Sequence, residues 1–276
     1  MTRRSALSLL AAPAAPAAPA PPFRLYTTGY PKPFLYPLVA PDGAVLSRGW
    51  PVAPRPGDSE DHAWHRGLFW GHGDINGFDF WREQQGTATL RVDRQRGLTL
   101  HQSLLTPNGS RLARLLTRYR FTLTPGAWQI DTELSLTSPQ PLRFGDTDDG
   151  GFAVRLREEF RLDRGAVMTN STGLSGKAIW GQSADWTNYT TTLSGKPYGV
   201  ALLSHPSNLR HPSGWHARPY GLNSANPFAA SSFANEKGGQ RGAYTLPAGQ
   251  PLTLRYRVLL HQGVAIAERY TQFTRE

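Results

Sequence analysis

Three histidines fall within one stretch of the chain, residues 60–81, beside six large aromatic residues, an arginine, an asparagine and several aspartates. They are His62, His65 and His72, and imidazole is the side chain that exchanges protons near neutral pH. A core segment would not carry so many titratable groups, and a solvated loop would not carry so many large aromatics. The composition is typical of a cleft lining, although an aromatic strand with histidines at its rim is the competing interpretation.

Two further stretches combine reactive or binding groups with residues that stiffen the backbone. Residues 205–220 follow an apolar run and contain two prolines, whereas residues 145–155 form an acidic turn before another apolar run. An ordinary basic surface loop is the competing interpretation of residues 205–220. We predict that all three stretches meet in one cleft, because dispersed patches would leave several tryptophans exposed without purpose.

Roles in this cleft follow from side-chain chemistry. Proton transfer is expected of the histidines and of a carboxylate that acts as base or orients an imidazole. These catalytic candidates are His62, His65, Asp146 and His205. Substrate binding is expected of groups that donate hydrogen bonds or present a ring face to a sugar. These binding candidates are Arg66, His72, Asn76, Trp81, Asn208, Arg210, His211 and Trp215.

We predict no cofactor and no resident metal site. His62 and His65 share a face on a helical turn and point in opposite directions on an extended strand. In the first case they could hold a metal ion with Asp61 or a distant carboxylate as a third ligand, but this spacing lacks the specificity of a metalloprotease motif. The chain contains no cysteine, which excludes disulfides and thiolate metal sites.

The elements that must position these groups are predicted to be strands. Period-two alternation and turn signals predict a meander over 87–94, 98–106, 113–124 and 128–138. Further strands are expected at 34–39 and 44–49 as a hairpin, and at 142–145, 152–156, 199–204 and 252–261. Residues 157–195 are expected to form long loops, and 264–274 a short closing helix. The pattern favours an all-β fold, a large antiparallel two-sheet β-sandwich that forms a single domain over residues 23–276.

Charge and terminal composition bear on partners and location. The formal net charge is +10, but the arginines are scattered without a basic run, so we predict that nucleic acid is not a partner. Residues 1–22 combine Arg3 and Arg4 with a short apolar stretch and an Ala/Pro tract, which predicts an export signal of the twin-arginine type or a disordered tail. No later segment has the ~20 apolar residues of a membrane helix, so we predict an exported protein without a membrane partner.

Three long motifs resemble one known family: DHAWHRGLFWGHGDINGFDFW, FGDTDDGGFAVR and SHPSNLRHPSGWHARPYG. They are similar to motifs of the PmoA-like family of domain-of-unknown-function proteins and occur in the same order. The resemblance implies an exported bacterial β-sandwich protein, encoded near sugar-modifying oxidoreductases. The family often carries another histidine where this chain has Trp64, so His62 and His65 remain the expected pair, and Asp146 matches the family's GDT motif.

The motifs and the resemblance together predict a carbohydrate-acting enzyme, either a glycoside hydrolase, a lyase or a sugar epimerase. The fold is expected to be similar to galactose-mutarotase-like supersandwiches, which also use histidine, arginine and a carboxylate; this is fold-level analogy. Its partner would be a small-molecule or oligosaccharide substrate. A non-catalytic carbohydrate-binding protein is the alternative. A metal-dependent oxygenase, which the family label implies, is the third interpretation.

Overall fold

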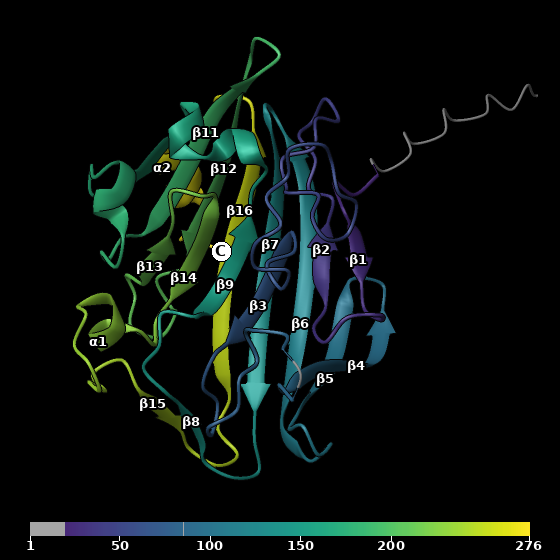
Figure 1. Ribbon diagram of the computed structural model, residues 1–276, viewed down its shortest axis with the longest axis vertical. Coiled ribbons are helices and arrows are strands. Elements are labelled where there is room, and N and C mark those ends of the chain that lie inside the picture. The colour runs from purple at the N-terminus through teal and green to yellow at the C-terminus, as the bar shows by residue number, and fades with distance from the viewer. Residues whose placement is uncertain (1–19, 85) are drawn as a thin grey trace, which may run out of the picture.

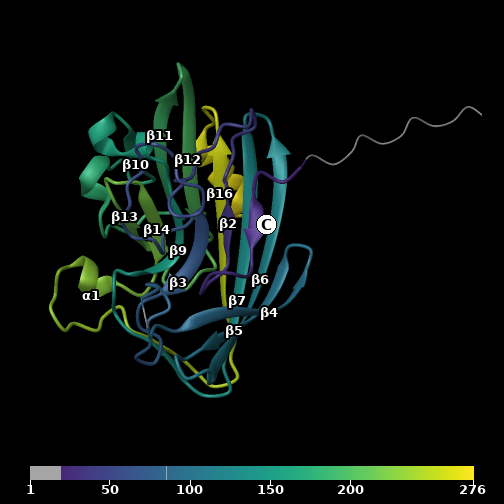
Figure 2. The ribbon, with the colours of Figure 1, turned by 45° about the vertical axis from the view of Figure 1, so that its right-hand side comes forward.

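The computed structural model describes residues 20–84 and 86–276, and almost all of the predicted export segment lies outside these residues. Two large antiparallel sheets face each other, which confirms the predicted all-β sandwich (Figure 1). Strands β3 (Leu68–His72) and β9 (Gly150–Arg155) of one sheet lie over β16 (Leu252–His261) and β7 (Ala127–Thr137) of the other (Figure 2). No helix in the described part of the chain is long and apolar enough to span a membrane.

The larger sheet has eight strands and contains the predicted meander. Across the sheet the order is β10 (Val167–Asn170), β11 (Trp186–Leu193), β12 (Lys196–Ser204), β16, β7, β6 (Arg111–Thr124), β5 (Thr99–Leu105) and β4 (Thr89–Arg96). Its inward side chains alternate along each strand, as in Leu134 and Leu136 of β7, which lie opposite Leu254 and Leu252 of β16. This period-two burial is what the sequence pattern predicted.

The smaller sheet has six strands, and its segments come from distant parts of the chain. Across the sheet the order is β1 (Arg24–Tyr26), β2 (Phe34–Tyr36), β3, β9, β14 (Leu222–Asn226) and β13 (Gly214–Ala217). The shorter elements are β8 (Leu142–Phe144) with β15 (Tyr244–Leu246), helices α1 (Ala230–Phe233) and α2 (Ile266–Phe273), and three 3₁₀ turns at Glu158–Phe160, Leu162–Arg164 and Gly176–Ile179. Helix α2 confirms the expected closing helix.

The core lies between the two sheets. Leu68 and Trp70 of β3 point inward beside Phe152 and Val154 of β9, and Phe152 stacks on Tyr256 of β16 with ring centroids 4.8 Å apart. Strand alternation sends the intervening side chains to the opposite face. The outer face of the six-stranded sheet is therefore lined by a different set of residues from the core.

Two expectations about the strands are wrong. Residues 157–195, predicted to be loops, contain β10 and β11, whose buried side chains include Met168 and Tyr189. Their hydrophobic pattern is weak because several of their buried side chains are polar, namely Asn170, Thr187 and Asn188. The hairpin predicted over residues 34–49 is reduced to β2 and one bridge between Val39 and Val45. The chain beyond β2 makes a second isolated bridge, between Ser47 and Leu156, instead of forming a long strand pair.

Candidate active site

One row of residues crosses the outer face of the six-stranded sheet. Phe69 of β3 lies opposite Ala153 of β9, Ala153 opposite Ser224 of β14, and Ser224 opposite His216 of β13. Directly opposed residues of an antiparallel sheet share one face, so all four point away from the core. This row forms the floor of the candidate site.

The chain before β3 folds over this floor and brings His62 and His65 together. A turn closed by the His65 N–H donating to the His62 carbonyl oxygen, at 2.9 Å, places the two imidazoles in parallel, with centroids 4.9 Å apart. His62 has a φ of 42°. This backbone conformation is uncommon for residues other than glycine, and it occurs more often at functional sites than elsewhere. His65 lies on Phe69 at 5.8 Å and edge-on to Trp81 at 5.3 Å.

Asp61 joins this turn to two arginines. Its Oδ1 lies 2.6 Å from a nitrogen of Arg48, 2.9 Å from one of Arg155 and 3.2 Å from His62 Nδ1. Burial opposes ionisation of Asp61, but the close approach of His62 Nδ1 and the charges of Arg155 and Arg48 outweigh it, so its pKa lies well below the usual range. The resulting carboxylate lies close enough to His62 Nδ1 to orient the ring.

Two histidines in the site are buried and held neutral. Burial lowers the pKa of His65 well below its usual value, and the positive charge of Arg155 acts in the same direction. Burial also lowers the pKa of His216 to about 4, against the opposing charge of Asp148. His216 Nδ1 donates to the Asp148 carbonyl oxygen at 2.6 Å, which leaves Nε2 as an acceptor. We name His62, His65 and His216 the histidine cluster.

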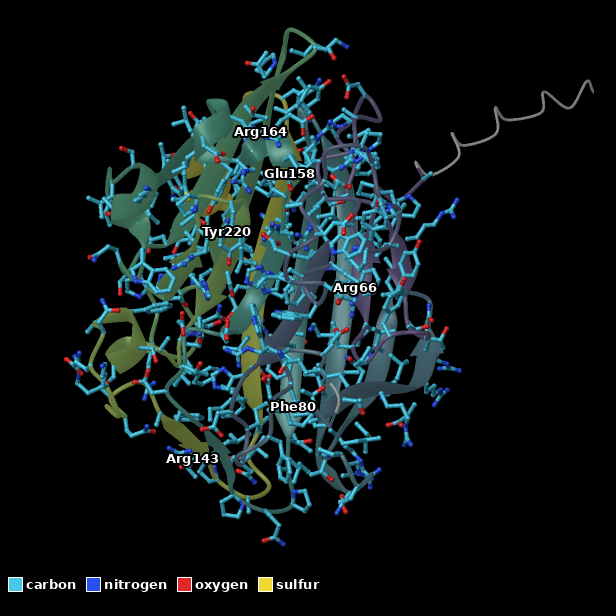
Figure 3. The ribbon with its side chains drawn as sticks, in the orientation of Figure 1. Arg66, Phe80, Arg143, Glu158, Arg164 and Tyr220 are labelled. Carbon is cyan, nitrogen blue, oxygen red and sulfur yellow. The ribbon has the colours of Figure 1, made fainter. Side chains whose placement is uncertain are left out.

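Half-buried aromatic residues surround the histidine cluster. Tyr220 stacks on His62 with centroids 5.4 Å apart, and Trp180 meets His216 edge-on at 4.9 Å. Trp64 is edge-on to His62 at 5.4 Å. Tyr220 lies near β13 and β14, and Arg66 on the side of β2, in Figure 3. The site is thus half-open, with His62 as its exposed histidine (side chain 39% exposed).

Several buried polar atoms in this site have no hydrogen-bond partner within residues 20–84 and 86–276. They include Nδ1 of His62, both ring nitrogens of His65, Nε1 of Trp64 and of Trp81, Nε of Arg48 and of Arg218, and two guanidinium nitrogens of Arg155. Buried donors and acceptors are nearly always paired with protein or ordered water, so their concentration here marks a place where a ligand or water binds.

The structure brings together only part of the predicted set. His62, His65 and Trp81 lie in one site, and Trp81 forms a buried wall that is also stacked on His216, with centroids 6.5 Å apart. The three stretches do meet there, but through other residues than predicted: Ala153 and Arg155 come from residues 145–155, and His216 and Tyr220 from residues 205–220. The other predicted residues lie elsewhere, so the expectation that Asp146, His205, Asn208 and His211 join His62 and His65 is wrong.

Three residues of the first stretch have structural partners outside the site. His72 points into the core, where its Nε2 donates to the Gly145 carbonyl oxygen at 2.9 Å. Arg66 forms a buried ion pair with Glu83. Asn76 adopts a φ of 52° in a turn, and its side chain accepts a hydrogen bond from the Arg143 N–H.

Asp146 and His205, the other two catalytic candidates, are separated from the histidine cluster. The Asp146 carboxylate accepts hydrogen bonds from the backbone N–H groups of Ser231, Ser232 and Gly242, and therefore fixes the loops around α1. His205 follows β12 in the other sheet and lines a crevice of about 360 Å³ with Arg255 and Phe273. His205 therefore belongs to the eight-stranded sheet, whereas the histidine cluster lies on the outer face of the six-stranded one.

The binding candidates of residues 205–220 are likewise structural. The Asn208 side chain donates to the Arg255 carbonyl oxygen and accepts from its N–H, which continues the pairing along β16. Arg210 donates to three backbone carbonyl groups, and His211 contacts Asp185 and Tyr270. Trp215 is fully buried in the core, where its indole N–H donates to the Ala184 carbonyl oxygen at 2.8 Å.

Sequence reasoning overlooked His216, Tyr220, Trp180 and Arg218 as site residues. The sequence could have indicated His216 through the alternating direction of side chains along β13. Only one of the neighbours Trp215 and His216 can point to the outer face. Because Trp215 is apolar and takes the core position, His216 takes the outer one. Trp180 gave no such signal, because it lies in a loop far from the other residues in sequence.

The comparisons with known proteins concern the family and the fold. A family model for a family of unknown function, DUF6807, matches residues 22–274. The chain belongs to DUF6807. This corrects the expected assignment to the PmoA-like family. A comparison with curated proteins gave no match. A solved polysaccharide lyase shares 10% sequence identity with this DUF6807 chain at a TM-score of 0.40, over 88% of this chain and 33% of the other, so the chain spans about a third of that structure.

The site of this DUF6807 chain is suited to proton transfer by imidazole. Across residues 20–84 and 86–276, no group of three or more His, Asp or Glu side chains is placed to hold a metal ion. His62 and His65 stack within 2° of parallel, so their nitrogens lie in separate planes and do not converge on one point. An exposed His62 beside the Asp61 carboxylate is instead the arrangement of a base and the group that orients it.

Proposed function

We propose that this chain is a carbohydrate-acting enzyme in which His62 exchanges a proton with the sugar and Asp61 orients its ring. The observation that carries the proposal is the exposed His62–Asp61 pair, set among aromatic faces above two buried neutral histidines. Imidazole suits proton transfer near neutral pH, and hydrolysis, elimination and epimerisation of sugars all need such a group.

The surroundings of the pair support a sugar as the substrate. Trp64, Trp180 and Tyr220 are half-buried around His62 and His216, and flat aromatic rings bind the apolar faces of sugar rings. The unpartnered nitrogens of His65 and Arg155 are suited to hydrogen bonds with hydroxyl groups, directly or through water. Such a mixture of apolar wall and few directed polar groups is typical of small-molecule sites.

The substitution His62→Gln tests the catalytic role. We expect wild-type protein to convert at least one member of a panel of oligosaccharides and monosaccharides, followed by NMR. The variant should lose about 10²–10⁴-fold in turnover, the usual contribution of general acid–base catalysis, while affinity measured by calorimetry changes little. The matched control is His101→Gln, which removes an exposed histidine on β5 of the other sheet and should retain full turnover.

Two outcomes would contradict the enzymatic proposal. Full turnover in His62→Gln would show that His62 does not transfer the proton. A wild-type protein that binds sugars and converts none, and loses affinity in His62→Gln, would be a carbohydrate-binding protein that uses the same site. The two cases differ in which quantity, turnover or affinity, depends on His62.

A further inference from the structure

We infer that the carbohydrate bound at the histidine cluster carries a carboxylate, and that Arg218 is the residue that binds it. This inference rests on the proposed function, since it specifies the substrate class of the same site. Three features of Arg218 support it: its position at the rim of the site, its rigidity, and the lack of a counter-charge among the described residues.

Arg218 lies at the rim of the site, next to the groups that face the sugar. Its guanidinium lies over the Trp180 ring at 4.5 Å and near the Tyr220 ring at 5.8 Å. These rings in turn contact His216 and His62, respectively. The charge of Arg218 helps to lower the pKa of His216, which also reflects this proximity.

The backbone around Arg218 is fixed by a tight turn between β13 and β14. The Arg218 N–H donates to the Leu222 carbonyl oxygen at 2.8 Å, and the Arg218 carbonyl oxygen accepts from the Gly221 N–H at 3.0 Å. The Tyr189 hydroxyl, buried in the core, donates to the same carbonyl oxygen at 3.0 Å. A guanidinium held in place by its turn and by ring stacking loses little freedom when it binds an anion.

The other arginines of the site already have carboxylate partners. Arg48 and Arg155 share Asp61. Among the described residues, Arg218 has no carboxylate within 4 Å and its buried Nε has no hydrogen-bond partner. Asp148 lies on the His216 side of the site, and its carboxylate makes no ion pair with Arg218 in the described structure.

A half-buried guanidinium without a counter-ion favours a ligand that supplies one. Carboxylates fit its fork with two parallel hydrogen bonds, and the stacked rings remove water that would screen the charge. Arg218 is therefore a specificity-determining residue for an acidic sugar, in which a hydroxymethyl group is replaced by a carboxylate. A neutral sugar would leave the guanidinium without this partner.

The test compares acidic trisaccharides of glucuronate, galacturonate and mannuronate with their methyl esters, by calorimetry at low salt. For at least one pair, wild-type protein should bind the acid at least 10-fold more tightly than the ester. The substitution Arg218→Gln should reduce this preference below about threefold, as expected when a charge-assisted bidentate pair of about 1.4 kcal/mol or more is lost. Arg94→Gln, which removes an exposed arginine on β4, is the control and should keep the preference.

Each alternative result has a defined meaning. Equal binding of acids and esters by wild-type protein would overturn the inference while leaving the proposed function intact, and tighter binding of a sulfated trisaccharide would also overturn it. Binding of no sugar at all would refute the proposed function itself. If Arg218→Gln fails to fold, Arg218→Lys keeps the charge without the fork and should retain only part of the preference; full retention there contradicts bidentate binding.

Discussion

Replacing Asp61 by asparagine should destabilise the fold by a predictable amount. The substitution keeps the size of the side chain but removes the negative charge between Arg48 and Arg155, whose side chains are fully buried. Both arginines would then lack a counter-charge at Asp61 and would repel each other. Arg48 would still donate to the carbonyl oxygens of His62 and His65, at 2.9 and 3.2 Å, so the turn keeps part of its support.

The expected magnitude follows from burial. Removing one partner of a fully buried ion pair typically costs about 3–5 kcal/mol, because the remaining charge is left uncompensated. The Asp61 side chain is 37% exposed, and water screens part of its interaction. Because of this screening, the loss should be smaller than for a fully buried pair. We expect the free energy of unfolding to fall by about 2–4 kcal/mol at neutral pH.

The pH dependence gives the sign of the effect. The folded-state pKa of Asp61 is depressed, so its stabilisation is present above the unfolded carboxyl pKa of about 3.9 and is lost as the pH falls through the folded value. The difference between wild-type protein and Asp61→Asn should therefore be constant from about pH 5 to 8 and shrink below about pH 4.

Urea unfolding followed by tryptophan fluorescence measures the difference, because the chain has eight tryptophans. Asp163→Asn is the control: Asp163 is an exposed surface residue paired with Arg161, and its removal should leave the unfolding midpoint unchanged. A loss below about 0.5 kcal/mol for Asp61→Asn at pH 7, the level of ordinary surface substitutions, would refute the reasoning about the buried arginines.

Three other predictions use the same unfolding assay. Burial lowers the pKa of His72, His216 and His261 to about 4, so the unfolded state binds more protons below its pKa of about 6.5. As the pH is lowered from about 6.5 to 4, the free energy of unfolding should fall by up to ~1.4 kcal/mol per pH unit for each histidine. A free energy of unfolding that does not change over this pH range would contradict this. Asp146→Asn should lower stability by about 1–3 kcal/mol with sugar turnover unchanged, whereas lost turnover at unchanged stability would restore its catalytic role. Gly151→Ala should cost about 2 kcal/mol or more, because the residue has a φ of 102° and a Cβ would meet a neighbouring carbonyl oxygen; near-wild-type stability would contradict that packing.

Local pattern was sufficient to predict the meander β4 to β7 of the larger sheet, although not β10 and β11. Strands β4 to β7 follow one another along the chain and pair with their neighbours, so alternation and turn residues determine both the strands and their order. The same locality made the pair of His62 and His65 predictable, since only Ala63 and Trp64 separate them. Trp81 belongs to the same stretch, which explains why it was predicted with them.

The remainder of the site was decided by tertiary structure. Alternation assigns Trp215 and His216 to opposite faces, but only the position of β13 in the six-stranded sheet determines which face is covered by the core. Arg155 and Trp180 come from distant parts of the chain, and no local pattern relates them or Arg48 to His62. His205 lies at the end of β12, which belongs to the other sheet, and hydrogen bonding between strands placed it away from the histidine cluster. A strand specifies two faces by itself, and its partners determine which one meets solvent, because burial is a property of the assembled sheets.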